Sequence, residues 1–195
     1  HLSNIITKKI DKFICIPVLK DHRASGVTLC LKNLSHGMVN NVARSHVTSL
    51  KGSRPDGVTL NQCHTFIPAM ASLAPIREKA VLQILDGLVG VWEGGPGSWN
   101  KTFATWKRES LFFATDAVAL DHVGWEIIDE QRRREKWPAV AEMGLDGKTG
   151  IVQVNGKPQH EQFHIRQPQH IPLAETLGLG VFQRDRIDHR TLALG

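Results

Sequence analysis

Lysine and histidine side chains that could do chemistry are concentrated in one early segment of the chain. Lys20 and His22 come first, Lys32 follows ten positions after this histidine, and His36 and His46 lie further on. A lysine beside imidazoles can bind a carboxylate or a phosphate, form a covalent link to a cofactor, or act as a base when it is buried. We therefore interpret Lys20, His22 and Lys32 as candidate catalytic residues.

Each of these residues also has a plain structural explanation. His22 could be a loop histidine that hydrogen-bonds the backbone, and the sequence leaves this alternative open. Lys32 stands inside the apolar stretch Leu31-Lys32-Asn33-Leu34, where a lysine without a partner is costly to bury. The structural explanation is therefore weaker for Lys32 than for His22.

Three side chains are candidate metal ligands. Neutral imidazoles hold late transition metals, so His36 and His46 could bind a divalent transition metal ion as a cofactor. Asp86 ends an apolar run and precedes Gly87. It could complete the metal site or orient a lysine, and a turn aspartate is an equal alternative.

The cysteines indicate neither a disulfide framework nor a cluster site. Cys15, Cys30 and Cys63 are far apart, and there is no C-x-x-C pair. We therefore expect no iron–sulfur cluster ligated by this chain, and we interpret Cys15 and Cys30 as buried thiols. We do not interpret Cys63 and His64 as a catalytic dyad, because adjacent side chains point in different directions.

The elements that position these residues follow from the hydrophobic pattern. An apolar run over Phe13–Val18 predicts a buried strand, and the polar segment Lys20–Gly26 predicts a loop at its carboxyl end. Val27–Leu34 is apolar with one lysine inside, which is compatible with a strand or a helix. A second buried strand is predicted over Lys79–Leu85, ending at Asp86-Gly87.

The clearest helix follows a third short strand, which is predicted over Leu111–Phe113. Thr115 or Asp116 caps this helix, which runs from Ala117 to about Lys136. Further elements are a helix from Asn61 to about Leu73, a short helix over Pro172–Leu177 and a last strand over Ile187–Leu194.

Strands that alternate with helices predict an α/β fold with a largely parallel or mixed sheet flanked by helices. In such sheets, ligands bind beyond the carboxyl ends of the strands. Three polar clusters fall at predicted strand ends, namely Lys20-Asp21-His22, Asp86-Gly87 and Thr115-Asp116. We therefore expect them to converge on one site. We expect residues 1–137 to form the α/β core and the turn-rich residues 138–195 to pack on it as an extension, within one domain.

Composition and charge describe an ordinary globular protein. The chain has 195 residues, 41% of them hydrophobic, and a formal net charge of +5. A mildly basic chain favours a small anionic ligand, whereas scattered basic residues are weak evidence for nucleic acid, and we interpret Arg132-Arg133-Arg134 as a solvated helix end. No apolar run approaches the ~20 residues that span a bilayer. The chain begins at His1 without a signal peptide, so a cytoplasmic protein, an exported protein with a removed leader and a fragment are all compatible with it.

A series of short motifs in a fixed order resembles the domain-of-unknown-function family 362. The motifs are Ile16-Pro17-Val18-Leu19-Lys20-Asp21-His22, Gly26-Val27-Thr28, Leu31-Lys32-Asn33, Ile84-Leu85-Asp86-Gly87, Gly94-Gly95-Pro96 and Ala114-Thr115-Asp116-Ala117-Val118-Ala119-Leu120-Asp121. The resemblance covers roughly residues 10 to 130, and more loosely Gly178-Leu179-Gly180. Ala117 stands where the family usually has proline. The amino-terminal α/β portion of family members is missing, so the chain resembles their carboxyl-terminal half.

Four residues within these motifs are candidate ligand-binding residues. They are Thr28, Asn33, Asp116 and Asp121. Helix capping is the better explanation of Asp116. Asp121 lies one turn inside the same helix, where it could pair with one of the two site lysines or lie on the solvated surface.

Two functions from different classes follow. The order histidine, lysine, histidine also resembles a segment of nickel-pincer lactate racemases, in which the lysine carries the cofactor and histidines serve the metal and the proton transfers. The first hypothesis is a cofactor- or metal-dependent enzyme that acts on a small anionic substrate by redox, racemase-like or isomerase-like chemistry. Some relatives in family 362 carry ferredoxin-like clusters, so the alternative is a non-catalytic binding module associated with iron–sulfur electron-transfer proteins. A degenerate fragment without activity is a third possibility.

Overall fold

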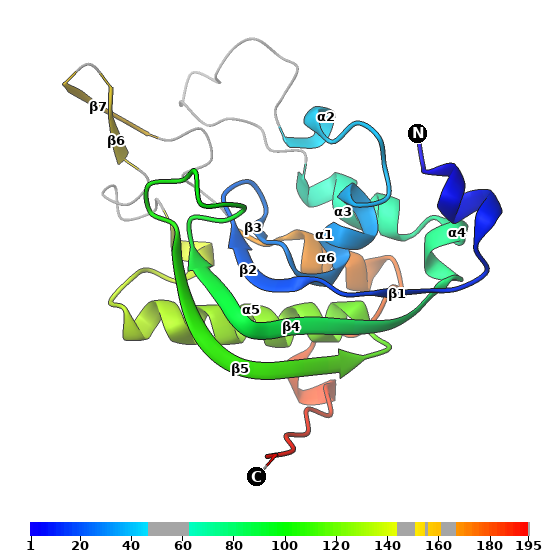
Figure 1. Ribbon diagram of the computed structural model, residues 1–195. Coiled ribbons are helices and arrows are strands. Elements are labelled where there is room, and N and C mark those ends of the chain that lie inside the picture. The colour runs from blue at the N-terminus through cyan, green and yellow to red at the C-terminus, as the bar shows by residue number, and fades with distance from the viewer. Residues whose placement is uncertain (47–62, 144–150, 155, 161–166, 195) are drawn as a thin grey trace.

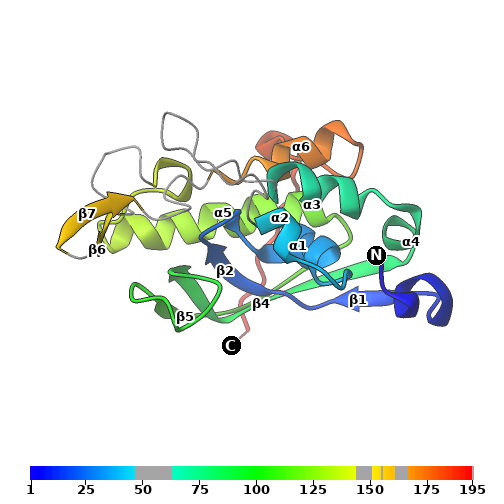
Figure 2. The same cartoon turned by 90° about the horizontal axis from the view of Figure 1, so that it is seen from above.

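One mixed β-sheet lies on one side of the molecule, and the larger helices lie together on the other side (Figures 1 and 2). The computed structural model describes residues 1–46, 63–143, 151–154, 156–160 and 167–194. The predicted α/β fold is confirmed, with these helices on one face of the sheet. In the described part of the chain, no helix is long and apolar enough to cross a membrane.

The longest strand organises the sheet. The strands are β1 (Phe13–Cys15), β2 (Val18–His22), β3 (Gly26–Val27), β4 (Ala80–Glu93) and β5 (Ala104–Ala114). β1 and β2 both run parallel to β4, β5 is antiparallel to β4, and β3 is antiparallel to β2. Because β4 pairs with three other strands, it forms the frame on which the β2 residues are placed.

Pro17 divides what the sequence predicts as one strand. Proline has no N–H to donate, but its carbonyl accepts a hydrogen bond from the Asp86 N–H at 2.8 Å, so the chain stays alongside β4. β2 then continues through Lys20 to His22, a segment that the sequence predicts as loop. That prediction was wrong because β4 extends far enough to pair with Lys20 opposite Val91.

Asp86 and Gly87 do not end a strand. The predicted strand over residues 79–85 continues as β4 to Glu93, because β5 pairs with it past this point, with Asp86 opposite Leu111. The expectation that Asp86 marks the carboxyl end of a strand was therefore wrong.

The segment from Val27 to Leu34, for which the sequence allows a strand or a helix, is mainly helical, because a helix begins at Leu29. The helices are α1 (Leu29–His36), α2 (Ala43–His46), α3 (Cys63–Ala71), α4 (Ala74–Arg77), α5 (Ala117–Arg134) and α6 (His170–Thr176). A π-helix at Ile5–Lys9, 3-10 turns at Val140–Glu142 and Arg184–Arg186, and the hairpin β6 (Ile151–Val154) and β7 (Lys157–His160) complete the described elements. The helices predicted near residues 117–136 and 172–177 are confirmed as α5 and α6, and the predicted cap at Asn61 lies outside the described residues.

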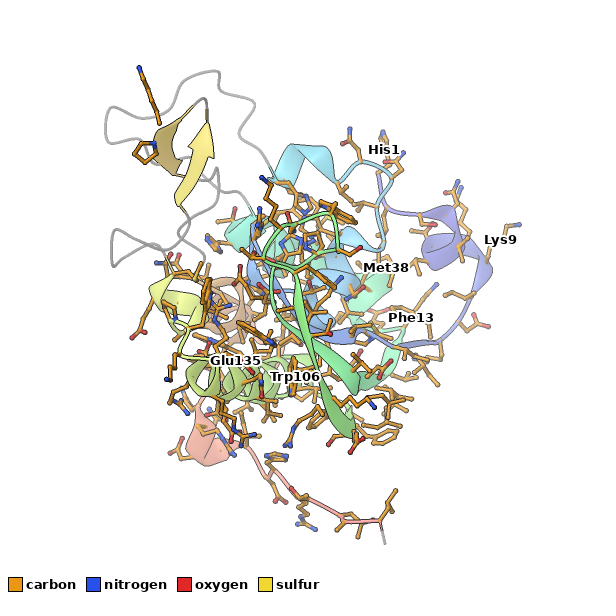
Figure 3. All side chains as sticks on the ribbon, turned by 60° about the vertical axis from the view of Figure 1, so that its left-hand side comes forward. His1, Lys9, Phe13, Met38, Trp106 and Glu135 are labelled. Atoms are coloured by element: carbon orange, nitrogen blue, oxygen red, sulfur yellow. The ribbon has the colours of Figure 1, made fainter. Side chains whose placement is uncertain are left out.

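The two ends of the chain behave differently. The first residues lie beside the segment after α1, where the Ser3 N–H donates to the Met38 carbonyl at 2.8 Å (Figure 3, in which His1 and Met38 are labelled). The last strand predicted over residues 187–194 is absent, and Leu192 and Leu194 are 84% and 88% exposed. That prediction was wrong because this segment runs away from the sheet (Figure 1).

The core lies between the sheet and the helices. Leu19 and Leu85 from the sheet and Val118 and Ile128 from α5 are fully buried in one cluster, which Ile171 of α6 joins. Each aliphatic side chain buried in this way stabilises the fold by about 1.5–3 kcal/mol. This core packs α5 and α1 on the sheet and so sets the position of the candidate site.

Asp116 fixes the start of α5. One carboxylate oxygen accepts hydrogen bonds from the N–H groups of Val118 and Ala119, and the other accepts from Val181 N–H at 2.9 Å. Gly180 packs so closely that a Cβ there would lie 2.0 Å from Asp116 Oδ1. Asp116 therefore acts as a helix cap that also anchors residues 178–181, and its carboxylate is occupied by backbone groups.

A buried ion pair fixes the other end of α5. Arg132 is fully buried, and its Nη1 donates to Glu93 Oε2 at 2.7 Å and to the Trp92 carbonyl at 2.9 Å. Its Nε donates to the Pro138 carbonyl at 2.6 Å. The interpretation of Arg132 as part of a solvated helix end was therefore wrong, although its neighbour Arg133 is exposed.

We expect Arg132→Met to lower the free energy of unfolding by about 3–5 kcal/mol, because it removes the buried guanidinium that pairs with the Glu93 carboxylate. Urea unfolding of the full chain measures this. Arg133→Met, an exposed change on the same helix turn, is the control and should stay within about 0.5 kcal/mol of the wild type. Equal stabilities for the two variants would contradict a structural role for the pair.

Candidate functional site

Five of the predicted site residues, which belong to β2, α1 and α2, are brought together in the fold. Lys20 and His22 belong to β2, Lys32 and His36 to α1, and His46 to α2. Lys32 Nζ lies 3.2 Å from His46 Nε2, and the ring centroid of His46 lies 5.5 Å from that of His22 and 4.6 Å from that of His36. We call these five residues the lysine–histidine cluster.

Asp121 sets the position of the helix that carries Lys32. The residue before α1, Thr28, makes no side-chain cap. Asp121 of α5 takes this role instead, accepting hydrogen bonds from the N–H groups of Cys30 at 2.6 Å and Leu31 at 2.9 Å. Burial raises the pKa of Asp121 to about 7, although these hydrogen bonds oppose the shift. The suggested pairing of Asp121 with a site lysine is not what the structure shows, because α1 occupies this carboxylate.

Asp21 holds the Gly94-Gly95-Pro96 loop against β2. Its carboxylate accepts hydrogen bonds from Gly94 N–H at 3.1 Å and Gly95 N–H at 2.7 Å. A Cβ on Gly95 would lie 2.2 Å from the Asp21 carbonyl oxygen, so only glycine fits. Lys20 Nζ donates to the Pro96 carbonyl at 3.4 Å. The loop therefore forms one wall of the cluster and holds the Lys20 ammonium beside it.

Lys32 is a buried cation without a counter-ion among the residues that the structure describes. Its side chain is only 7% exposed, and no described carboxylate forms an ion pair with it. Burial lowers the pKa of Lys32 to about 8, with a smaller contribution from the charge of Lys20. A lysine in this position can exchange its proton close to neutral pH.

The hydrogen bonds of two histidines define their tautomers. His46 Nδ1 lies 2.8 Å from the Val42 carbonyl, which can only accept, so Nδ1 carries the proton and Nε2 offers a lone pair to Lys32. His22 Nδ1 accepts from Ala24 N–H at 3.0 Å, so its proton is on Nε2. Burial lowers the pKa of both rings, and the charge of Lys32 lowers them further. Of these two neutral imidazoles, His46 therefore accepts a hydrogen bond through Nε2, whereas His22 carries a proton on Nε2.

Cys63 joins the cluster from the first turn of α3. The ligand atoms of His36, His46 and Cys63 all lie within 4.8 Å of one another, a spacing that could hold a metal ion. Burial raises the pKa of the Cys63 thiol to about 11, and its Sγ lies 3.1 Å from the Ser45 carbonyl. Sequence reasoning missed Cys63 as a ligand because it considered this residue only as a partner for the adjacent His64.

His170 and His64 lie close to the same cluster, and sequence reasoning assigned neither of them to it. His170 is fully buried, and its two ring nitrogens have no hydrogen-bond partner within the described ranges. Burial lowers the pKa of His170 to about 3, and the charges of His64 and Lys32 add to this effect. No local pattern indicates His170, because only the packing of α6 on α3 brings it here.

Three of the predicted site residues take other roles. Asp86 Oδ1 accepts from Leu88 N–H at 2.9 Å, and its partner in the sheet register is the exposed Leu111. Asp86 is therefore not part of the group with metal-ligand spacing, which consists of His36, His46 and Cys63. Asn33 Nδ2 donates to the carbonyl of the first α1 residue at 2.6 Å, and Thr28 is buried beside the same turn with a hydroxyl that has no described partner.

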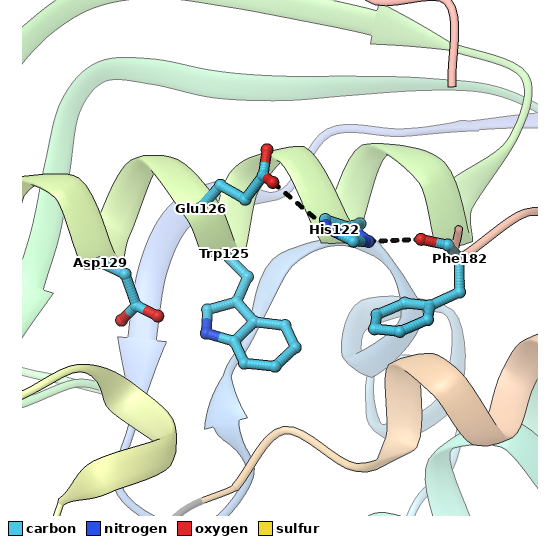
Figure 4. Close-up of a pocket in the computed structure, with 5 residues that line it drawn as sticks. All are labelled: His122, Trp125, Glu126, Asp129 and Phe182. Carbon is cyan, nitrogen blue, oxygen red and sulfur yellow. Dashed lines mark hydrogen bonds and ion pairs between the residues drawn. The ribbon is translucent and has the colours of Figure 1, made fainter. Parts of the chain in front are cut away.

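A separate open pocket of about 230 Å³ lies between α5 and residue 182 (Figure 4). It is lined by His122, Trp125, Glu126, Asp129 and Phe182. His122 Nδ1 donates to the Phe182 carbonyl, and Glu126 is paired with His122 and with Arg184 at 3.0 Å. Because His122 and Glu126 are already paired with each other and with groups beside the pocket, this pocket is a weaker candidate than the lysine–histidine cluster.

Comparison with known proteins identifies a family. The family model described as Domain of unknown function (DUF362) matches residues 4–126. This range contains the lysine–histidine cluster and Cys63, and His170 lies beyond it. No curated protein and no solved structure matches the chain.

The buried histidines should make the fold sensitive to acid. An unfolded histidine takes up a proton near pH 6.5, whereas in the fold the pKa values of His36 and His170 are lowered to about 2 and about 3. Below pH 6.5 the unfolded state therefore binds more protons, and the free energy of unfolding falls by up to about 1.4 kcal/mol per pH unit for each histidine. The raised pKa of Asp121 acts in the opposite direction between 3.8 and about 7, but it is a single group.

Thermal melts from about pH 7 to about pH 5 measure this effect. We expect Tm to fall as the pH falls, and we expect a shallower fall for His170→Phe. His189→Phe, which changes an exposed histidine near the end of the chain, should keep the wild-type slope. A wild-type Tm that does not change across this range would show that the histidines are not held neutral by burial.

Proposed function

We propose that this chain, which belongs to the DUF362 family of domains of unknown function, is a metal- or cofactor-dependent enzyme that acts on a small anionic substrate. The observation that carries the proposal is the buried Lys32 ammonium, which has no carboxylate partner in the described part of the chain. A buried charge without a counter-ion is costly, so an anionic ligand at this position would offset the cost.

The lysines have the role of binding the substrate anion. Lys20 is close enough to Lys32 to lower its pKa, and both face a cluster whose histidines are neutral. Two neighbouring ammonium groups repel one another, and an anion between them relieves that repulsion. A carboxylate or a phosphate group suits this arrangement, since each can accept hydrogen bonds from both lysines.

Proton transfer is the reaction that these side chains support best. His46 Nε2 offers a lone pair and His22 Nε2 carries a proton, so an acceptor and a donor lie on two neighbouring rings. Paired acceptors and donors of this kind serve racemases and isomerases, which remove a proton and return it. A redox reaction would depend instead on the electrons of a bound metal or cofactor.

The group of His36, His46 and Cys63 would hold a divalent transition metal. Imidazole nitrogen and thiolate sulfur are ligands of zinc, nickel, cobalt and copper, whereas magnesium and calcium prefer oxygen. Three protein ligands leave a coordination position for the substrate. A metal bound there would supply a Lewis acid that polarises a substrate carbonyl or carboxylate. His46 would bring this ion next to Lys32.

The alternative, a non-catalytic module that binds iron–sulfur proteins through surface lysines, fits these residues less well. A lysine that contacts a protein partner needs to be exposed, and Lys32 is 7% exposed. The burial of Lys32 therefore favours the enzyme over the docking module.

We expect Lys32→Met to abolish the binding of sulfate, used as a probe anion, because it removes the buried ammonium. Isothermal titration of the full chain measures the affinity. The variant should keep or increase the melting temperature without sulfate, because it removes an uncompensated buried charge. The control is Lys107→Met, an exposed lysine of β5 that should leave sulfate binding unchanged. If Lys32→Met still binds sulfate, the proposal that the Lys32 ammonium forms the anion site is refuted.

We expect Zn²⁺ to bind the full chain and to lose at least roughly tenfold in affinity in His46→Gln and in Cys63→Ser, since even changes behind a ligand cost that much. Co²⁺ provides the spectroscopic check, because its thiolate-to-metal absorption should disappear in Cys63→Ser. The control is Cys15→Ser, a buried thiol outside the group. Equal zinc affinity in all four proteins, or no binding at all, would refute the metal site.

A further inference from the structure

The His46 ring has one lone pair that can accept a hydrogen bond or coordinate a metal ion, and it lies on Nε2. Its Nδ1–H is committed to the Val42 carbonyl at 2.8 Å, so only Nε2 can donate electrons. The Lys32 ammonium occupies that position at 3.2 Å. His46 also belongs to the group with His36 and Cys63, and a metal-binding histidine commonly donates its other ring N–H to a backbone carbonyl, as His46 does.

We propose that a metal ion and the Lys32 ammonium compete for His46 Nε2, so that metal binding releases Lys32 to hold the substrate anion. Metal and anion then bind cooperatively. This inference rests on the proposed function, because it needs both the metal and the anion at the lysine–histidine cluster. It adds an order to the site: the metal-free state holds Lys32 on His46, and the metal-bound state makes Lys32 available.

Helix α2 holds the metal-ligand group together before any ion binds. Ser45 Oγ lies 2.6 Å from His36 Nε2, and the Ser45 carbonyl lies 3.1 Å from Cys63 Sγ. Ser45 Oγ also donates to the Val42 carbonyl at 3.0 Å, the acceptor that orients His46. Coordination would replace the contact between His36 and Ser45, but Ser45 would keep its bond to Val42. Only short-range changes are therefore needed to convert the hydrogen-bonded group into a metal site.

Electrostatics gives the coupling its sign. A metal on His46 Nε2 removes the acceptor of the Lys32 ammonium and places a second positive charge beside it. The charged neighbour of Lys32 within the described cluster is Lys20, another cation, and the histidines are held neutral by burial. The released ammonium therefore gains more from an anion than it does in the metal-free state, because an anion is attracted by both positive charges.

A direct bond between the anion and the metal would also produce coupling, but that coupling would not depend on Lys32. The two explanations predict different results for Lys32→Met. If Lys32 competes with the metal, the variant should bind Zn²⁺ more tightly than the wild type in the absence of sulfate. If the anion binds only to the metal, the zinc affinities of the two proteins should be equal without sulfate.

The experiment measures zinc and sulfate affinities of the full chain in all combinations. In the wild type, Zn²⁺ should tighten sulfate binding at least roughly fivefold, and sulfate should tighten Zn²⁺ binding by the same factor. In Lys32→Met this coupling should disappear, and zinc alone should bind more tightly than in the wild type. Lys107→Met should retain the wild-type coupling.

Two results would overturn the inference while leaving the proposed metal site in place. One is zinc binding that depends on Cys63 and His46 but does not tighten sulfate binding in the wild type. The other is equal tightening in the wild type and in Lys32→Met, which would assign the anion to the metal alone. Zinc that fails to bind would refute the metal site, and so would zinc that binds Cys63→Ser and His46→Gln as tightly as the wild type. The proposed competition between the metal and Lys32 would then be refuted as well.

Discussion

The carboxylate of Asp121 is the interaction on which the site depends. It is fully buried, it lies in α5, and it accepts two N–H groups of the first turn of α1. The positive end of the α1 dipole and this carboxylate stabilise one another, and among the described residues the carboxylate has no cationic partner. Because α1 is held at its first turn, Lys32 and His36 extend from it at set positions towards α2 and α3. α5 is itself fixed at its start by Asp116 and near its end by the Arg132–Glu93 pair. The position of α5 therefore determines where α1 places Lys32 and His36.

The charged and titratable side chains in and around the cluster have two different roles in this structure. The carboxylates of Asp21, Asp116 and Asp121 all bind backbone N–H groups, so each holds one segment against another. The lysines and histidines, in contrast, are brought together with few partners. Among the residues that the structure describes, the partner of the Lys32 ammonium is an imidazole, and the ring nitrogens of His170 have no partner. A fold gains little stability from collecting cations and imidazoles in its interior, and such arrangements are typical of sites that bind a ligand.

The cluster also shows why acid–base and metal chemistry can share one set of residues. The same imidazole can accept a proton, accept a hydrogen bond from an ammonium or coordinate a metal, because each use needs one lone pair on a neutral ring. The Val42 carbonyl binds the Nδ1–H of His46, so the lone pair of that ring is on Nε2. The Ala24 N–H donates to Nδ1 of His22, so the lone pair of this ring is on Nδ1. The backbone therefore assigns different chemical roles to two rings whose centroids lie 5.5 Å apart.

The sequence alone determined those parts of the structure that are formed by contacts between residues close to one another in the chain. The cap and periodicity of α5 are local, and so is the segment from Lys20 to His46, whose strand, turn and helices fold back on one another. The α/β fold and most of the cluster could therefore be predicted. Only the tertiary structure decided the rest. Asp86 is not part of the site, because β5 extends β4 past this residue. Cys63 and His170 lie at or near the site because α3 packs beside α1 and α6 packs on α3. Arg132 is buried because its partner, Glu93, comes from the sheet. Hydrophobic periodicity reports which side of an element is buried, but the partner that buries it is chosen by packing between segments that are distant in sequence.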